Sequence, residues 1–167
     1  RSSRHRRACI GSKRRVMKTS PNGPQPTLRG RAIKLLARRE HSRAELAKKL
    51  ALFGPTEEIN SVLDQLEHNG LLSDARMAAA YVRGHAARFG AARLGQNLRT
   101  KGISNELIEA SLSQNEVLDE KQRAGTIWQR KFGVKPHDPR EWARQARFLQ
   151  GRGFSTEIIC KLLKAPE

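Results

Sequence analysis

The sequence predicts an all-α protein made of tandem three-helix repeats that form an elongated, curved array, right- or left-handed. Leucine-rich helical stretches run into a glycine three times, at Gly54, Gly102 and Gly153, and apolar residues resume about five positions later. These glycines lie roughly 50 residues apart, which leaves room for three short helices per repeat. No alternating apolar and polar run marks a strand. We therefore expect nine helices, with each of the three glycines in the left-handed conformation that closes a helix.

The chain divides into four segments by composition and spacing. Residues 1–26 mix arginine, serine, glycine and proline without an apolar period, which predicts a disordered basic leader. The three-helix repeats are expected at 27–72, 73–115 and 116–167. Met17 is a candidate native start, in which case the residues before it are an extension, and the alternative is a basic arm that grips phosphate.

The first repeat is expected to begin near Thr27. Ser42 and Glu45 form a capping box, in which the serine hydroxyl accepts an amide proton of the first turn and the glutamate side chain returns to the cap amide. A second helix therefore starts after Ser42 and is expected to run to the first of the three glycines. Pro55 opens a third helix because proline suits a first turn, and Gly70 closes it.

Two polar residues, Ser73 and Asp74, are candidate caps at the start of the second repeat. The helix that follows them is expected to continue to Arg88, and Gly90 breaks it. The next helix is predicted over 91–101, where it meets the second of the three glycines.

The helices that close the second and third repeats share one start signal. Ser104 is a candidate cap between Ile103 and Ile108, which stand one residue before the cap and at the fourth helical position, as in a hydrophobic staple. The corresponding places after the third glycine hold Phe154, Ser155 and Ile159. Both repeats are thus predicted to begin their last helix by the same mechanism.

The third repeat is expected to open with a helix over 117–132. Asp138 as cap, Pro139 at the first position and Glu141 at the third then begin a second helix. The aromatic residues of this repeat recur at helical spacing among apolar residues, so we interpret them as core side chains and not as a platform for stacking bases. They are Trp128, Phe132, Trp142 and Phe148.

Positive charge is the main chemical feature of the chain. The formal net charge is +17, and the first 16 residues hold seven arginines and lysines and no acid, so a surplus of +10 remains from Met17 onward. Such a surplus favours a polyanionic partner, which is nucleic acid, an acidic protein groove or an anionic membrane surface. The membrane is the least favoured, because no apolar run approaches the roughly 18 residues that cross a bilayer.

The sequence holds no pattern for enzymatic or metal chemistry. It lacks a phosphate-binding glycine loop, a nucleophile elbow and a His-Glu-x-x-His helix, so we expect no enzyme, no cofactor and no metal site. Cys9 and Cys160 do not suggest a disulfide framework, which fits a reducing, cytoplasmic location. Because a repeat array needs no partner to close its cores, we also expect a monomer.

Basic side chains recur in every repeat. A single run of charge is usually a solvated face, but recurrence in an array predicts a basic stripe along one side. The predicted stripe comprises Arg31, Lys34, Arg38 and Arg39 in the first repeat, Arg83, Arg88, Arg93, Arg99 and Lys101 in the second, and Arg144, Arg147 and Arg152 in the third.

Four motifs follow one another in a fixed order. They are Ala32…Leu36-Ala-Arg-Arg39 with Ser42-x-x-Glu45-Leu46, then Gly70-Leu-Leu-Ser-Asp74 with Ala79-x-Tyr81-Val82, then Leu98-x-x-Lys101-Gly102-Ile103, and then Phe148-Leu149-x-x-Arg152-Gly153-Phe154-Ser155. Together they resemble the motifs of the RecX family, the bacterial regulators of the RecA recombinase, over residues 27–165. The arginine-rich leader is the one clear departure.

The resemblance implies a function as well as a fold. Members of this family bind the RecA–DNA filament, lie in its helical groove and impede filament extension, ATP hydrolysis and strand exchange, which restrains recombination and the SOS response. The expected partners of this chain are therefore the RecA nucleoprotein filament and DNA, single-stranded more strongly than double-stranded. The resemblance supplies no site residues, and we expect the basic stripe to make the contact because its cations recur in every repeat. Two alternatives remain open, namely a sequence-nonspecific DNA- or RNA-binding helical protein and a scaffold for an acidic protein.

Overall fold

The computed structural model describes residues 26–114 and 120–164, and this part of the chain forms nine α-helices and no strand. The all-α prediction is confirmed. Unit 1 contains α1 (Leu28–Leu36), α2 (Arg43–Leu50) and α3 (Thr56–His68); unit 2 contains α4 (Asp74–His85), α5 (Ala91–Thr100) and α6 (Asn105–Gln114); unit 3 contains α7 (Glu120–Lys131), α8 (Pro139–Gly151) and α9 (Thr156–Leu163).

Some predictions fall on residues outside these ranges. The leader predicted over 1–26, apart from its last residue, lies outside the described residues, and so does the start of the helix predicted over 117–132. The borders predicted between repeats, after residues 72 and 115, stay predictions.

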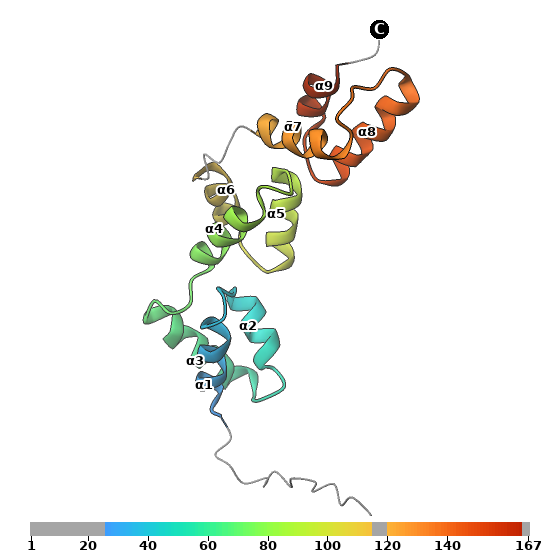
Figure 1. The fold of residues 1–167 in the computed structure, drawn as a ribbon. Helices are drawn as coiled ribbons and strands as arrows, with labels where there is room; N and C mark the ends of the chain where they lie inside the picture. Colours follow the sequence, from blue (N-terminus) through green and yellow to red (C-terminus); the bar gives the residue numbers. More distant parts are fainter. Residues whose placement is uncertain (1–25, 115–119, 165–167) are drawn as a thin grey trace, which may run out of the picture.

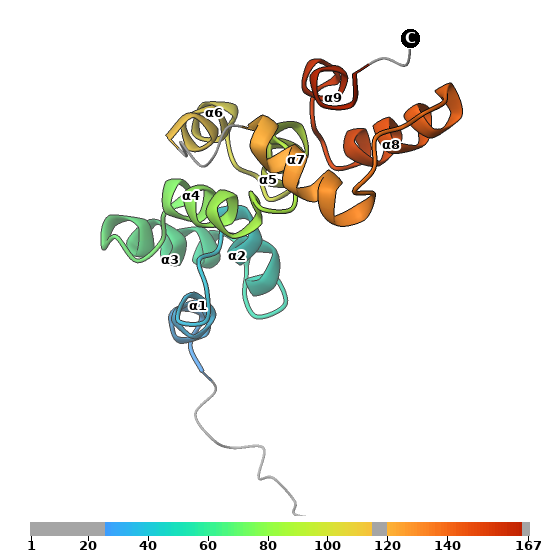
Figure 2. The same ribbon diagram turned by 45° about the horizontal axis from the view of Figure 1, so that its top comes forward.

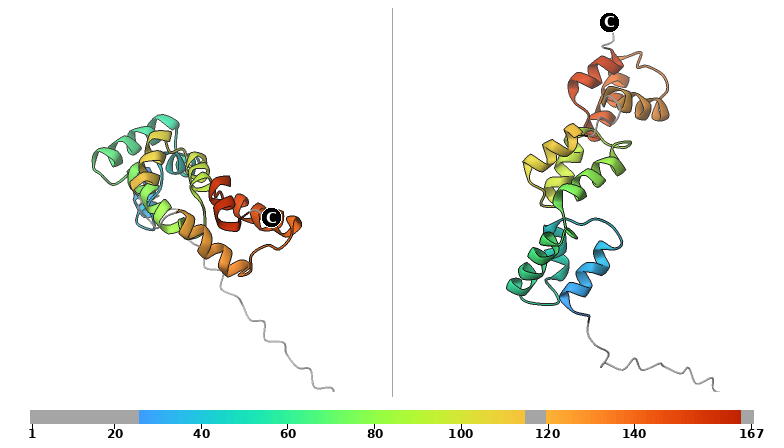
Figure 3. Two further views of the ribbon diagram at one scale, coloured as in Figure 1. Left: turned by 90° about the horizontal axis from the view of Figure 1, so that it is seen from above. Right: turned by 90° about the vertical axis from the view of Figure 1, so that its left-hand side faces the viewer.

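The three units follow one another along one axis. In Figure 1, unit 1 (blue to green) lies at the bottom, unit 2 in the middle and unit 3 (orange to red) at the top. Figure 2 shows the first helices of the units, α1, α4 and α7, in the same order along the array. The two views of Figure 3 show a long body whose third unit is displaced to one side, so the array is both elongated and curved.

Each unit has its own hydrophobic core. Leu46 and Leu63 lie in the core of unit 1, Leu94 in that of unit 2 and Leu149 in that of unit 3, and all four side chains are fully buried. Burial of one leucine side chain contributes about 2 kcal/mol to folding. The helix pairs that pack extensively all belong to the same unit, so the units meet only through a few residues near helix ends.

The aromatic residues of unit 3 lie in or against its core, as predicted. Trp128 is buried and its Nε1–H donates to Oε1 of Gln145 at 2.7 Å. Phe132, Trp142 and Phe148 pack against the same cluster. Their area therefore stabilises the unit and supplies no stacking platform.

Most of the predicted helix starts are confirmed. Ser42 and Glu45 form the complete capping box before α2. The hydroxyl oxygen of Ser73 accepts the Arg76 amide proton at the start of α4. At the start of α8, Asp138 accepts the Glu141 amide proton at 2.7 Å, and proline occupies the first helical position.

The two hydrophobic staples are also present. Ile103 and Ile108 are buried in one cluster around the Ser104 cap, and Phe154 and Ile159 are buried in another. The hydroxyl oxygen of Ser104 accepts the Leu107 amide proton at 3.4 Å, and Ser155 plays the same part at the start of α9. The start signal predicted for both repeats is therefore confirmed.

The prediction for the three glycines is right twice and wrong once. Gly102 and Gly153 have φ angles of 79° and 86°, and the paired backbone hydrogen bonds around each close the helix as a Schellman motif. Gly54 has no positive φ, and α2 already ends at Leu50. A Cβ at Gly54 would lie 2.8 Å from a methyl carbon of Leu28, so this glycine permits a close approach within unit 1.

Other helix ends differ slightly from the prediction. Pro55 precedes α3 as its cap residue and is not within the first turn, which begins at Thr56. Helix α4 ends at His85 instead of Arg88. Residues 86–88 still form a turn after α4, so the chain bends earlier than the glycine at position 90.

A recurring junction joins the units through their second helices. At junction 1–2, the Ser42 hydroxyl donates to the carbonyl of Lys101, the residue that caps the end of α5, at 2.5 Å. At junction 2–3, the Gly90 amide donates to the carbonyl of Arg152, which caps the end of α8, at 2.9 Å. The start of one second helix thus meets the end of the next, an arrangement that favours the helix dipoles.

An acidic residue completes each junction. Asp74, the first residue of α4, accepts the Arg43 amide proton at the start of α2 at 2.8 Å. Glu120, the first residue of α7, accepts the Ala91 amide proton at the start of α5 at 2.9 Å. Each acid thus satisfies an amide that has no partner inside its own helix. The equivalent residue of α8 is Pro139, which has no amide proton to donate.

Close backbone approach explains the left-handed glycines. A Cβ at Gly102 would lie 2.5 Å from Cβ of Ala44 in α2, and one at Gly153 would overlap the backbone of Arg93 in α5. Within the described residues, the closest neighbour of Gly54 is Leu28 of its own unit, and this different contact accounts for its different conformation. The glycine signal in the sequence therefore marks two junctions and one contact within a unit.

Candidate polyanion-binding surface

The predicted basic residues of unit 1 differ in what they contact. Lys34 and Arg38 are exposed and form no ion pair within the described residues. The Arg31 guanidinium lies over the Phe53 ring at 4.0 Å. Arg39 pairs with Glu45 at 3.3 Å. Lys34 and Arg38 are therefore the two of these residues that present their full charge to a partner.

The basic residues of unit 2 divide in the same way. Arg83 and Arg93 are exposed, and neither forms an ion pair in the described part of the chain. Nε of Arg99 donates to the side chain of Asn105 at 3.0 Å, and this contact links the end of α5 to the start of α6. Lys101 reaches across junction 1–2 and is only half-exposed.

In unit 3 the two arginines along α8 make local contacts. Arg144 pairs weakly with Glu141 at 3.5 Å, and Nε of Arg147 donates to the carbonyl of Ala143 at 3.1 Å. Both are exposed. They remain accessible to an anion, because an exposed ion pair contributes at most about 1 kcal/mol.

Glu45 accepts hydrogen bonds from several groups at junction 1–2. Its carboxylate accepts from Lys101 at 2.7 Å, from Arg39 at 3.3 Å and from the Ser42 amide at 3.3 Å. Burial on its own would raise the pKa of Glu45, but these hydrogen bonds outweigh it and lower the pKa to about 2. Lys101 and Arg39 therefore help to hold units 1 and 2 together, and Glu45 partly offsets their charge.

Junction 2–3 brings predicted residues of two units into one place. Arg88 of unit 2 and Arg152 of unit 3 line the same pocket, and the Arg152 guanidinium donates to the Arg88 carbonyl at 3.4 Å. Two further cations line this pocket, Arg130 and Lys131, which the sequence pattern did not single out. Their place in the last turn of α7 marks them as helix-end cations, but only the fold shows that they meet Arg88.

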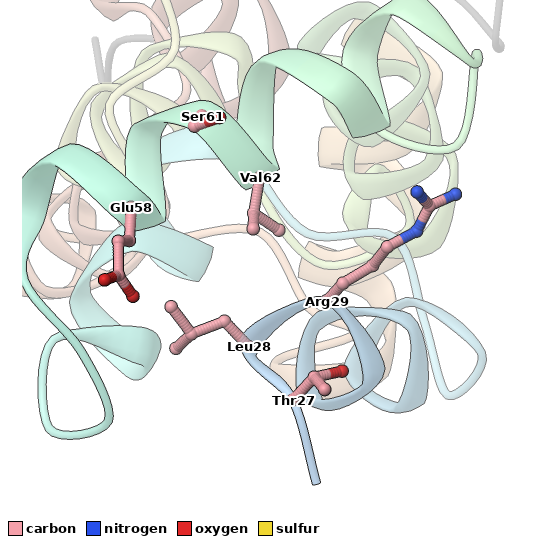
Figure 4. A pocket seen from close by; sticks show the side chains of 6 residues that line it. All are labelled: Thr27, Leu28, Arg29, Glu58, Ser61 and Val62. Carbon is pink, nitrogen blue, oxygen red and sulfur yellow. The ribbon is translucent and has the colours of Figure 1, made fainter.

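Another pocket lies at the outer end of unit 1, between α1 and α3 (Figure 4). Its walls are the first residues of α1 and one side of α3, with Leu28 and Val62 as its apolar part. It contains one cation, Arg29, and one acid, Glu58, so it carries no surplus charge. This pocket is less suited to a polyanion than junction 2–3.

Over 26–114 and 120–164, no three His, Cys, Asp or Glu side chains come together as a metal site. None of the helices in these ranges is long and apolar enough to span a bilayer.

Comparison with known proteins identifies each unit. Profiles of the first, second and third three-helix domains of RecX match residues 29–66, 73–112 and 119–163. The chain is 48% identical to the regulatory protein RecX of Leptothrix cholodnii over 86% of its own length and 91% of that protein. It is 46% identical to the regulatory protein RecX of Pseudomonas entomophila, over 81% and 89% of the two chains.

Solved structures give the same result for the fold. The crystal structure of RecX from Lactobacillus salivarius superposes with a TM-score of 0.71 at 21% identity, over 83% of this chain and 94% of that one. A second crystal structure, of a regulatory protein RecX, has a TM-score of 0.71 at 25% identity and covers 82% of this chain and 71% of that one.

Proposed function

The chain belongs to the RecX family of regulatory proteins, and on that basis we propose that it regulates the RecA recombinase by binding the RecA–DNA filament. In this proposal the bound array impedes filament extension, ATP hydrolysis and strand exchange, and so restrains recombination and the SOS response. The observation that carries it is the match of all three units, in order, to the three domains of that family.

The shape of the array supports a filament as the target. Units whose centres follow one axis present equivalent helices at regular intervals, so one molecule can contact several protomers of a helical polymer together. The groove of such a polymer is long and narrow, and an elongated, curved body fits it better than a compact one (Figures 1 and 3).

The exposed cations support contact with acidic groups or DNA phosphates. We propose that the predicted stripe is this contact surface. The residues that have no ion pair within the described structure contribute most to the binding of acidic groups or phosphates. They are Lys34, Arg38, Arg83 and Arg93. Arg39 and Lys101 contribute less, because Glu45 already holds them at junction 1–2.

The proposal is of a regulator that acts by binding alone. It requires neither a catalytic residue nor a cofactor, and one chain suffices because each unit closes its own core. It places the protein in the cytoplasm, where RecA and chromosomal DNA meet. DNA contributes to affinity through single strands more than through duplexes.

The test is RecA ATP hydrolysis on single-stranded DNA while the protein is titrated well below the RecA concentration. We expect hydrolysis to fall at these low ratios, because one regulator blocks the growth of a whole filament. If hydrolysis falls only when the protein saturates the DNA, simple competition explains the effect, and the chain is a nonspecific nucleic-acid binder instead.

A pair of charge-reversal variants tests the surface itself. Arg83→Glu with Arg93→Glu is expected to raise the concentration for half-inhibition about 30-fold, since the two exposed cations contribute about 1 kcal/mol each, or about 2 kcal/mol together, to a charged contact. Arg29→Glu with Lys48→Glu is the matched control, because it makes the same charge change at exposed sites outside the predicted stripe. Equal losses in both variants would reject a localised surface.

A further inference from the structure

The pocket at junction 2–3 combines cations from two units. Arg88 follows α4 in unit 2, Arg130 and Lys131 end α7, and Arg152 caps the end of α8. The cavity measures about 260 Å³, and Ile127 with Phe148 forms much of its apolar wall. The pocket exists only when unit 3 is seated on unit 2.

The charge in this pocket has no internal counterpart. Within the described residues, none of the four cations pairs with an aspartate or glutamate. Junction 1–2 is built differently, because Glu45 neutralises part of the charge there. Four like charges around one small cavity repel one another, so a bound anion would stabilise this junction.

Arg152 is already held in position. Its guanidinium lies over the Phe148 ring at 4.5 Å and donates to the Arg88 carbonyl at 3.4 Å. Phe148 is in turn fixed by an edge contact with Phe132, whose ring centre lies 5.2 Å away. An arginine fixed in this way loses little conformational freedom when it binds an anion, which favours recognition of a planar or tetrahedral oxyanion.

We propose that this pocket binds a phosphate group of a single DNA strand and thereby fastens unit 3 to unit 2. The two arginines suit the oxygens of a phosphate group, and neighbouring phosphates of the same strand can compensate the remaining cations. The apolar wall of Ile127 and Phe148 receives the adjoining sugar. The choice of DNA as the source of the phosphate rests on the proposed function, but the pocket does not require RecA.

The experiment measures binding of a fluorescent thymidine oligonucleotide to the full chain, without RecA, across a range of salt concentrations. The test variant is Arg130→Gln with Lys131→Gln, since both side chains are exposed and have no ion pair in the described structure. The control is Arg29→Gln with Lys48→Gln, which removes the same charge from unit 1. Circular dichroism verifies that both variants fold.

We expect the test variant to bind about 10-fold more weakly and the control to change less than about 2-fold. The slope of log affinity against log salt should fall by about 0.7 for each phosphate that the variant no longer binds, and by less in the control. Equal losses in the two variants, or no loss in either, would overturn the proposal.

Competition identifies the source of the anion. Excess unlabelled oligonucleotide should displace the probe from the parent protein, whereas ATP at the same phosphate concentration should displace much less. Displacement by ATP as effective as that by the oligonucleotide would assign the pocket to free nucleotides and contradict the proposal. Displacement by poly-glutamate as effective as that by DNA would assign it to an acidic protein and contradict it equally.

The DNA-binding experiment and the RecA-inhibition experiment can fail independently of each other. If the parent protein fails to inhibit RecA but the test variant still loses DNA affinity, the pocket stands and the RecA proposal fails. If RecA inhibition is normal and the test variant binds DNA like the parent, the RecA proposal stands and the pocket proposal fails.

Discussion

Substitution Glu45→Gln should weaken junction 1–2 more than any other single charge removal in unit 1. The pKa of Glu45 falls from 4.5 to about 2, because the hydrogen bonds from Lys101 and Arg39 outweigh the effect of burial. A difference of about 2.5 pH units corresponds to about 3.4 kcal/mol at 1.36 kcal/mol each. The side chain is 17% exposed, so solvent screens part of this energy, and we expect a loss of about 2 kcal/mol at pH 7.

The acid dependence has a definite sign. A carboxyl group with a lowered pKa in the folded state contributes stability that is fully present above pH 4.5 and is lost as the pH falls toward 2. Urea unfolding at several pH values between 2 and 7 should therefore show a steeper acid loss in the parent than in the Glu45→Gln variant.

Two spectroscopic signals locate the effect in the chain. Both tryptophans, Trp128 and Trp142, belong to unit 3, whereas circular dichroism reports helices of all units. We expect Glu45→Gln to shift the dichroism transition to lower urea and to leave the fluorescence transition near its original place. Glu157→Gln serves as control, because Glu157 pairs only with Lys161 on the surface of α9.

The reasoning fails if Glu45→Gln unfolds within about 0.5 kcal/mol of the parent and keeps the same acid slope, since surface substitutions typically stay in that range. Coincident shifts of both signals would also contradict it, because they would show that the units unfold as one.

Two more predictions concern junction 2–3 and a buried histidine of unit 1. Gly153→Ala should destabilise the protein by about 2–4 kcal/mol in thermal unfolding, because the new Cβ overlaps the backbone of Arg93 and the positive φ is unfavourable for alanine. Gly151→Ala is the control and should cost less than about 0.5 kcal/mol, because a Cβ there has no neighbouring atom within 4 Å. Burial lowers the pKa of His41, whose ring accepts a hydrogen bond from the Lys49 ammonium group. The neutral ring therefore contributes its full stability above about pH 6.5, and this contribution declines at lower pH. His41→Gln should flatten the pH profile of unfolding just below about pH 6.5, and an unchanged profile would rule this role out.

Local signals in the sequence predicted the helix starts well. A cap such as Ser42 or Asp138 depends on residues within one turn, so its pattern can be read without knowledge of the fold. The staples around Ser104 and Ser155 have the same property, because both apolar partners lie within five residues of each other. These signals located the starts of α2, α6, α8 and α9.

Features that depend on distant residues could not be read in this way. The conformation of Gly54 differs from that of Gly102 because, within the described residues, Gly102 meets the preceding unit whereas Gly54 meets its own. Arg130 and Lys131 join Arg88 in one pocket through the placement of α7 beside the end of α4, and more than forty positions separate them in the sequence. The predicted stripe likewise gave no sign that Lys101 binds Glu45 across a junction.

The proline at the start of α8 bears on polymerisation. A head-to-tail contact between unlike faces produces open fibres when both faces are left exposed on the same molecule. Here Pro139 offers no amide proton to an incoming acid, and the turn at Gly54 lacks the left-handed form that the contact uses. The two ends of the described array therefore lack the amide donor and the left-handed turn through which the units of one chain are joined.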